Sequence, residues 1–353
     1  MISYKVIGVM SGTSLDGIDV AYIHFKKQEF WTFSILQATT ISYTKEMEQE
    51  LREAIHYEKE KLAQFDTTYT KHLATVINSF IKKYQITDID AVCSHGHTVL
   101  HQPENGITYQ IGNQELLAEI IQQKLVCDFR VQDVAFGGQG APLVPIGDEL
   151  LFSEYDYCLN LGGFANVSFH QSGKRIAYDI CPVNIVLNKY AKQLGFEYDD
   201  KGSLAKSGEY LMVLGSELNN LSFYEQKPPK SLGLEWVQEE IFPRLEKSKR
   251  KELDILRTFT EHIAQQIAKN FKIRTKILVT GGGAYNDYLL SRIKFYKDVN
   301  LVKPSDELIE YKEAVVFGFL GILRLRDEVN CLKSVTGAVK NHSSGEVYDF
   351  KVN

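Results

Sequence analysis

The chain has 353 residues, of which 44% are hydrophobic and 24% are charged, and its formal net charge is −5. This composition is ordinary for a globular protein, and the charge gives no electrostatic basis for binding nucleic acid or an anionic membrane. The longest apolar run, residues 314–323, is too short to cross a bilayer. No secretory signal is visible and the five cysteines form no Cys-x-x-Cys pair, so we expect a soluble, cytoplasmic protein with small, buried cysteines rather than cysteine ligands.

The turn at residues 12–19 combines glycines, hydroxyls and two carboxylates between two runs of strand-forming residues. Because β-branched and aromatic residues resume directly after it, we expect a β-hairpin rather than a loop that opens a helix. Its glycines permit close backbone approach, Thr13 and Ser14 can donate hydrogen bonds to phosphate, and Asp16 can hold Mg²⁺ through water. An ordinary hairpin turn uses the same residue types, so this segment alone leaves both interpretations open.

A third strand is expected at residues 33–42, followed by a helical region at 45–84 whose apolar positions recur every three or four residues. Next we expect three short strands at residues 91–94, 108–111 and 124–128, with a helix at 116–123. Antiparallel strands followed by alternating helices and strands predict a mixed sheet.

The segment 136–145 is rich in turn-forming residues and poor in core positions, which indicates a crossing between domains. Beyond it, residues 157–170 repeat the opening pattern as a strand, a turn at Gly162 and Gly163, and a second strand. We therefore expect two domains of related design, each presenting a hairpin turn to a shared cleft that grips a polyphosphate. The expected domains are residues 1–133 with about 332–353, and residues 134–331.

A glycine triplet, Gly281, Gly282 and Gly283, follows a buried strand at residues 277–280 and precedes another helix. Bare backbone at such a position lets the flat surface of a nucleoside lie close to the chain. A tight strand-to-helix turn is the alternative, but the order of the triplet after two hairpin turns favours nucleotide binding.

Asp179 follows an expected strand at residues 175–178, where a carboxylate facing a cleft can take a proton from a nucleophile, as in sugar kinases. A cap or turn aspartate is the alternative. Arg130 also follows a strand and can pair with an anionic group on a ligand, or form an internal salt bridge with Asp128 or Asp133.

His95, His97 and His101 lie close together, but no nearby cysteine or carboxylate completes a tetrahedral zinc set with the usual spacing. We therefore expect histidines that hydrogen-bond in or beside a cleft. Glu313 precedes an apolar helix at residues 314–325, where its charge would favour the helix N-terminus.

Eight segments, taken together and in order, resemble the anhydro-N-acetylmuramic acid kinase family nearly from end to end. They are residues 8–19, 94–96 together with 98, 110–112, 128–130, 137–145, 159–166, 281–283 and 334–338. The resemblance implies an α/β fold of the actin-like ATPase, sugar kinase and Hsp70 type, with two ribonuclease-H-like domains and mixed sheets around an ATP cleft.

The resemblance also implies an ATP-dependent phosphotransferase of peptidoglycan recycling. Water opens the 1,6-anhydro bridge of anhydro-N-acetylmuramic acid while the released O6 takes the γ-phosphoryl of ATP, giving N-acetylmuramic acid 6-phosphate. Asp179 matches the family's catalytic aspartate, which would deprotonate the water.

On this basis we expect ATP and Mg²⁺ as cofactors and a small-molecule sugar as the partner, with no binding to nucleic acid or a membrane. A homodimer is the candidate assembly. Asp16 is the expected magnesium residue, through water. The candidate substrate-binding residues are His95, Arg130, Asn184 and Glu313. The candidate cofactor-binding residues are Gly12, Thr13, Ser14, Leu15, Asp16, Gly17, Ile18, Asp19, Gly162, Gly163, Asn166, Gly281, Gly282 and Gly283.

Two segments depart from the family pattern. Residues 179–184 read Asp-Ile-Cys-Pro-Val-Asn where the family has Asp-Thr-Gly-Pro-Gly-Asn or a close variant, so side chains stand where bare backbone would meet substrate. Residues 230–235 read Lys-Ser-Leu-Gly-Leu-Glu for Lys-Ser-Thr-Gly-Arg-Glu, and losing the arginine would weaken recognition of an anionic group such as a lactyl carboxylate. The alternatives are a kinase of a related anhydro- or amino sugar, and a non-kinase ATPase of the Hsp70 or actin type.

Overall fold

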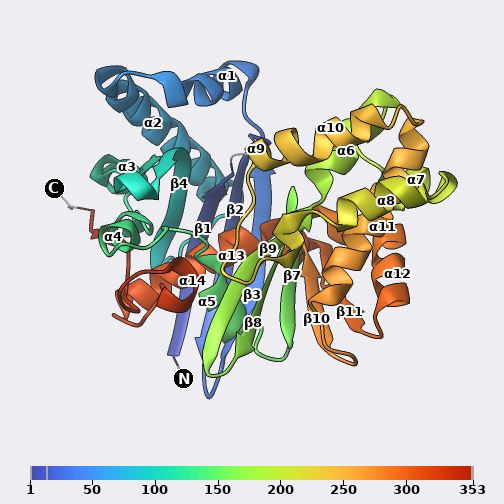
Figure 1. Ribbon diagram of the computed structural model, residues 1–353. Helices are drawn as coiled ribbons and strands as arrows, with labels where there is room; N and C mark the ends of the chain where they lie inside the picture. The colour runs from blue at the N-terminus through green and yellow to red at the C-terminus, as the bar shows by residue number, and fades with distance from the viewer. Residues whose placement is uncertain (1, 13–14, 351–353) are drawn as a thin grey trace. The chain divides into compact units, whose positions relative to one another are not determined.

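The computed structural model describes residues 2–12 and 15–350, which form two compact units with one sheet each (Figure 1). Unit 1 is built from residues 1–151 and 311–353, and unit 2 from residues 152–310. Among the described residues, no helix combines the length and the apolar character needed to cross a bilayer.

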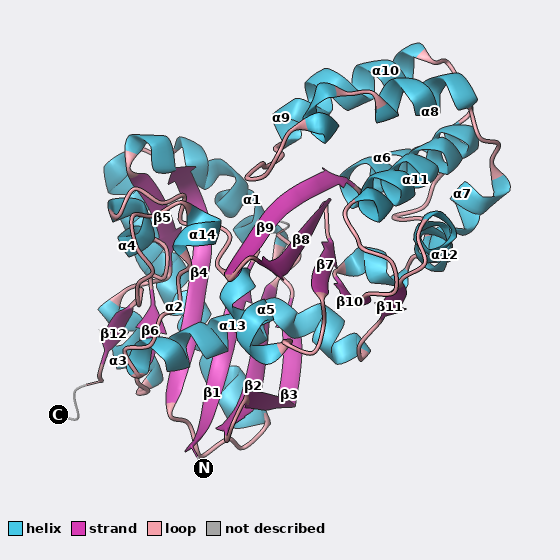
Figure 2. Ribbon diagram, turned by 60° about the horizontal axis from the view of Figure 1, so that its bottom comes forward, coloured by secondary structure: helices cyan, strands magenta, loops and turns pink. Residues whose placement is uncertain are grey.

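Unit 1 contains a seven-stranded mixed sheet in the order β12-β6-β4-β1-β2-β3, with β5 paired to β4 (Figure 2). The first three strands form an antiparallel meander, whereas β1 pairs parallel to β4 and β4 pairs parallel to β6. The strands are β1 Ile2–Ser11, β2 Ile18–Lys27, β3 Trp31–Ile41, β4 Ala91–Gln102, β5 Ile107–Ile111, β6 Leu125–Cys127 and β12 Glu346–Tyr348. The helices are α1 Lys45–Glu53, η1 Ala54–His56, α2 Lys59–Lys83, η2 Pro103–Asn105, α3 Glu115–Ile121, α4 Val131–Ala135, α5 Val144–Leu151, most of α13 Asp306–Leu325, and α14 Lys333–Thr336.

Alternating residues of β1 face the two helical layers of unit 1. Ile7 and Val9 are buried in a core that includes the apolar stripe of α2, such as Leu73. On the other face, the backbone of Gly8 lies so close to the Ala314 carbonyl that a Cβ at this position would collide with helix α13. The glycine therefore lets α13 pack directly on the sheet.

Unit 2 contains a five-stranded mixed sheet in the order β11-β10-β7-β8-β9. Its strands are β7 Tyr157–Leu161, β8 Phe164–Gln171, β9 Lys174–Pro182, β10 Lys276–Thr280 and β11 Asn300–Val302. Its helices are α6 Asn184–Gln193, η3 Asp200–Gly202, α7 Ser203–Ser207, α8 Met212–Asn219, η4 Ser222–Glu225, α9 Leu234–Trp236, η5 Val237–Ile241, α10 Phe242–Lys247, α11 Glu252–Lys269, η6 Gly282–Tyr285 and α12 Asp287–Tyr296. Alternate β7 residues pack against the buried side of α11, including Phe259 and Ile263.

The two sheets share one strand order. In each, three antiparallel strands are followed by one strand that pairs in parallel with the first, and by a further strand that pairs in parallel with that one. This repeated ribonuclease-H-like order confirms the expected α/β class with two mixed sheets, and both expected hairpins are present. All five cysteines are free and buried, as expected.

The structure moves both expected domain boundaries, from 133 to 151 and from 332 to 311. The turn-rich segment 136–145 belongs to unit 1 because its backbone is held there: Gln139 N donates to Thr336 O and Gly140 N donates to an Asp133 carboxylate oxygen. Most of α13 belongs to unit 1 because its glycines allow close packing on the first sheet. A turn-rich composition marks loops, but it does not show whether a loop joins domains or lies within one.

Candidate functional site

The hairpin turn of unit 1 joins β1 to β2, and its expected phosphate donors Thr13 and Ser14 lie outside the described residues. Leu15 N donates to Gly12 O at 3.2 Å across the turn. The side chains of Leu15 and Ile18 are buried in the core of unit 1, so only their backbone can meet a cofactor.

Two carboxylates mark the same hairpin. Asp16 is exposed at the turn, and Asp19 is half-buried on β2. Asp19 Oδ1 accepts a 2.6 Å hydrogen bond from the hydroxyl of Thr40 on β3, which orients that carboxylate. Carboxylate oxygens on an accessible turn suit a hydrated Mg²⁺, because this ion takes few protein ligands and keeps several waters.

A buried polar network lies beneath this turn, and sequence patterns did not reveal it. The Ser11 hydroxyl is 2.6 Å from Tyr43 Oη and 2.8 Å from His97 Nδ1, and Tyr43 Oη is 2.8 Å from Tyr69 Oη. Burial lowers the pKa of His97 to about 4, so the ring is neutral at pH 7. The network anchors the end of β1, where the turn begins.

Arg130 and His95 form a connected pair in unit 1. Arg130 Nε donates to His95 Nε2 at 2.9 Å, and Arg130 Nη1 donates to the Gly140 carbonyl at 2.5 Å. His95 Nδ1 donates in turn to Gly96 O at 2.9 Å, so both ring nitrogens are used within the protein. Burial and the Arg130 charge place the pKa of His95 well below its usual range, which keeps it a neutral acceptor. Burial also lowers the pKa of Arg130 to about 10, and the guanidinium stays charged at neutral pH.

The three histidines make the expected hydrogen bonds: His97 with Ser11, His95 with Arg130, and His101 Nδ1 with Thr108 Oγ1 at 3.1 Å. Their expected place in or beside a cleft stays a prediction. The expectation for Glu313 is wrong in one respect. Helix α13 begins at Asp306, so Glu313 lies in its interior and does not interact with its N-terminus.

Glu313 remains exposed and is electrostatically linked to Arg130. Desolvation by neighbouring protein atoms raises its pKa, and the charges of Arg130 and Lys312 oppose that rise. Lys312 itself is buried and pairs with Asp148 at 2.7 Å. Glu313 and Arg130 therefore form a pair of opposite charges on unit 1.

Asp179 in unit 2 lies inside β9, which continues to Pro182 instead of ending before the carboxylate as expected. Asp179 N donates to Lys230 O at 3.1 Å, and Asp179 Oδ2 accepts from Leu232 N at 2.8 Å. The side chain is half-buried, and desolvation raises its pKa while the Leu232 N–H bond opposes the rise. A half-buried carboxylate with a raised pKa, held by a segment distant in sequence, is suited to accept a proton.

The two glycine turns of unit 2 meet at the ends of the neighbouring parallel strands β7 and β10. Asn184, at the start of α6, is hydrogen-bonded to the first turn. Its Nδ2 donates to Leu161 O at 3.1 Å, and its backbone N donates to Gly162 O at 3.3 Å. A Cβ on Gly282 would lie 3.7 Å from Asn184 Nδ2, so the triplet is close to the same amide.

The glycines of these turns serve different purposes. A Cβ on Gly281 would lie 2.6 Å from Asn160 Oδ1, and one on Gly283 would lie 2.7 Å from Leu161 Cβ, so packing requires both. Gly162, Gly163 and Gly282 have no contact closer than 3.4 Å to such a Cβ. Packing therefore does not require glycine at these three positions, where the backbone is bare. Asn166, on β8, is half-buried and pairs directly with Asp179 on β9.

The substituted residues of the 179–184 segment do not point into open space. Ile180, Cys181 and Val183 are all at least 98% buried and belong to the core of unit 2. In the second departing segment, Leu232 is half-buried, whereas Leu234 is 47% exposed. The change of surface chemistry is therefore concentrated at Leu234.

Comparisons with known proteins match nearly the whole chain. The family model described as anhydro-N-acetylmuramic acid kinase matches residues 4–350. The anhydro-N-acetylmuramic acid kinase of Mannheimia succiniciproducens is 33% identical over 99% of this chain and 100% of that protein, and that of Sulfurimonas denitrificans is 31% identical over 97% and 99%. Among solved structures, the xylulose kinase of Lactobacillus acidophilus is 11% identical, with a TM-score of 0.44 over 98% of this chain and 94% of that one.

Proposed function

The chain belongs to the anhydro-N-acetylmuramic acid kinase family, and we propose the roles of its residues in an ATP-dependent sugar kinase reaction. In that reaction water attacks the anomeric carbon of anhydro-N-acetylmuramic acid, and the C1–O6 bond of the bridge breaks. O6 keeps the electron pair and attacks the γ-phosphorus of ATP, whose bond to the bridging β–γ oxygen breaks. The products are N-acetylmuramic acid 6-phosphate and ADP.

Asp179 is the general base in this proposal. Its carboxylate takes the proton that the attacking water must lose as the bridge opens. The Leu232 N–H holds one carboxylate oxygen, which leaves the other to face the water. This half-buried, backbone-held carboxylate is the observation that carries the assignment.

The Arg130 and Glu313 pair binds the sugar in this proposal. Arg130 offers a planar cation that suits a carboxylate or a sugar hydroxyl, and Glu313 accepts hydrogen bonds from hydroxyls. His95 acts through Arg130 as a positioning residue, because its own ring nitrogens are used within the protein.

The glycine turns of unit 2 and the β1–β2 hairpin, which carries Asp16 and Asp19, bind ATP in this proposal. Gly162, Gly163 and Gly282 allow the nucleotide to lie against bare backbone, and Asn184 and Asn166 contribute amides beside these turns. Asp16, with Asp19 behind it, would hold Mg²⁺ through water, and Mg²⁺ when bound neutralises phosphate charge.

One assay tests the proposal. Purified protein is incubated with ATP and anhydro-N-acetylmuramic acid, and both the sugar phosphate and ADP are followed in wild type, Asp179→Asn and the exposed-carboxylate control Asp298→Asn. Formation of sugar 6-phosphate by wild type and the control alone supports the role of Asp179. ATP binding without any sugar phosphate would refute the reaction, and turnover of a related sugar in a substrate panel would reassign the acceptor. Cytoplasmic location and a homodimer remain predictions, for cell fractionation and light scattering.

A further inference from the structure

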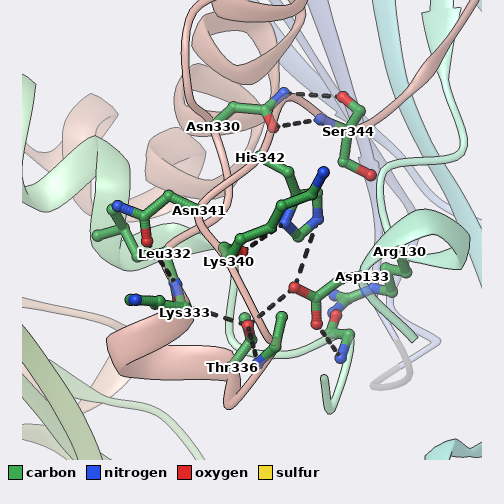
Figure 3. Close-up of polar contacts among 12 residues, drawn as sticks. Arg130, Asp133, Asn330, Leu332, Lys333, Thr336, Lys340, Asn341, His342 and Ser344 are labelled. Carbon is green, nitrogen blue, oxygen red and sulfur yellow. Dashed lines mark hydrogen bonds and ion pairs between the residues drawn. The ribbon is translucent and has the colours of Figure 1, made fainter. Parts of the chain in front are cut away.

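A cluster of three buried side chains lies in unit 1, within electrostatic reach of Arg130 of the proposed sugar site. Asp133 comes from helix α4, and Cys331 and His342 come from the C-terminal segment; they are 0%, 1% and 6% exposed. Each offers one ligand atom, and these three atoms lie within 4.8 Å of one another. Figure 3 shows the Asp133 carboxylate facing the His342 ring.

The backbone holds two of these side chains next to each other. Cys331 and His342 form an antiparallel bridge, with Cys331 N donating to His342 O at 3.0 Å and His342 N donating to Cys331 O at 3.2 Å. Directly paired residues of antiparallel strands project to the same face. The thiol and the imidazole are therefore presented together to Asp133.

One of the two ring nitrogens of His342 has no hydrogen-bond partner among the described residues. Nδ1 lies 3.1 Å from Lys340 O and donates to it, so in the neutral ring Nε2 carries the lone pair. Nε2 is buried, has no hydrogen-bond partner in the part of the chain that the structure describes, and lies 3.5 Å from Asp133 Oδ1. Two acceptor atoms therefore lie 3.5 Å apart, an arrangement that a bound cation would stabilise.

We propose that Asp133, Cys331 and His342 form a binding site for a thiophilic divalent cation, with zinc as the ion that this donor set fits best. Carboxylate oxygen, thiolate and imidazole are all zinc ligands, and a tetrahedral ion holds its ligand atoms about 3–4 Å apart. Small inward movements of the side chains reach that spacing. Binding releases the thiol proton to solvent, and the resulting Zn²⁺, thiolate and carboxylate have zero net charge, which suits a buried site.

Outer contacts already orient two of the ligands. Lys340 O fixes the His342 tautomer, the Thr336 hydroxyl donates to Asp133 Oδ1 at 2.8 Å, and Gly140 N donates to Asp133 Oδ2 at 2.7 Å. Such partners are the usual surroundings of protein metal ligands.

A cavity lies beside residues that are adjacent in sequence to two of the ligands. It has a volume of about 560 Å³ and is lined by Gln132 and Ser343, the sequence neighbours of two ligands. Three carboxylates, Asp128, Asp327 and Glu346, and one cation, Arg324, also line it, and Arg324 pairs with Asp327 at 2.8 Å, which leaves an excess of negative charge.

The site would tie the C-terminal segment to the arginine of the proposed sugar site. Asp133 holds Gly140 N, and Gly140 O accepts from Arg130. A bound ion would therefore stabilise the loop that positions Arg130. This role is structural and reaches the proposed reaction only through Arg130, because none of the three ligands is assigned to base or phosphate chemistry.

The test uses the untagged 353-residue chain, dialysed against buffered Zn²⁺ with a competing chelator and analysed by elemental mass spectrometry. We expect about one zinc per chain in wild type and a loss of affinity of about tenfold or more in Cys331→Ser and His342→Gln. Cys158→Ala and His170→Gln, which change a buried cysteine and an exposed histidine of unit 2, should bind as wild type does.

Cobalt substitution of wild type supplies a readout that does not depend on the variants folding. A thiolate-to-cobalt charge-transfer band in wild type supports the site. Absence of that band, no zinc uptake by wild type, or equal uptake by His342→Gln would overturn the proposal. The last two outcomes would leave the contact between His342 and Asp133 as a structural contact without a metal.

Discussion

The hairpins of the two units have the same strand order but carry different chemistry at matching positions. One residue pair away from the turn, Asp19 on β2 faces Thr40 on β3 in unit 1, whereas Asn166 on β8 faces Asp179 on β9 in unit 2. The carboxylate thus lies on the second strand in unit 1 and on the third strand in unit 2. In unit 1 a neighbouring hydroxyl holds it, and in unit 2 the backbone of Leu232, distant in sequence, holds it. A repeated fold thus supplies two similar positions, and tertiary contacts make them different.

The largest effect is expected for the unit 2 carboxylate. Asp179→Asn keeps an oxygen for the Leu232 N–H and removes the proton acceptor, so we expect kcat to fall by about 10²- to 10⁴-fold. ATP affinity, measured by calorimetry, should stay near the wild-type value. Retention of more than about a tenth of the wild-type kcat would contradict a base role.

The unit 1 carboxylate should have a smaller effect of another kind. Asp19→Asn should raise the Mg²⁺ concentration for half-maximal activity by about 10- to 100-fold, because Asp19 lies behind the expected ion rather than on the proton path. Thr40→Val should produce a weaker change in the same direction, since it removes only the orienting hydroxyl. An unchanged Mg²⁺ dependence in Asp19→Asn would remove this carboxylate from the metal site.

Substitutions at two glycines of the triplet test ligand binding and packing separately in unit 2. Gly282→Ala should raise KM for ATP by about tenfold, equivalent to 1.4 kcal/mol, with little change in Tm, because its Cβ has space in the protein. Gly281→Ala should instead lower the free energy of unfolding by about 1–3 kcal/mol, because its Cβ meets Asn160 and Leu161. Equal ATP kinetics for Gly282→Ala and wild type would leave the triplet a structural turn.

The acid side of the pH profile should report Asp179. A base acts in its deprotonated form, so kcat/KM falls by up to about tenfold per pH unit as pH drops below its pKa. Because burial raises the pKa of Asp179, this fall should begin at a higher pH than the usual aspartate range near ~4. An acid limb that persists unchanged in the residual activity of Asp179→Asn would point to another group.

The smallest effect concerns a carboxyl of unit 1 that is also desolvated. Burial, with help from Glu346, raises the pKa of Asp128 to about 6, so its ionised form opposes folding. The protonated Asp128 carboxyl contributes its full stability at pH values below the pKa that it has in the unfolded chain. That contribution is lost as pH rises through about 6, the pKa of the folded state. Asp128→Asn should therefore increase the free energy of unfolding by about 1–2 kcal/mol at pH 8 and change it little near pH 4, measured by urea unfolding.

Local patterns in the sequence were sufficient for the two hairpins and the long helical region. Alternation and turn residues act over a few positions, so they predict strands such as β1 and β7 before any long-range contact is known. The order of the motifs that resemble the kinase family predicted the fold class and the family itself. The family match over residues 4–350 confirms the family. The two-domain organisation was also expected, although its boundaries were displaced.

Tertiary structure alone decided what individual polar residues contact. His95 supports Arg130, Glu313 lies inside a helix, and the altered Ile180, Cys181 and Val183 are core residues. Each outcome depends on segments far apart in the chain, and no local period encodes which of them become neighbours. The same reason kept Cys331 and Asp133 apart in the sequence-based view: almost two hundred positions separate them along the chain, and only folding brings them within reach of one ion.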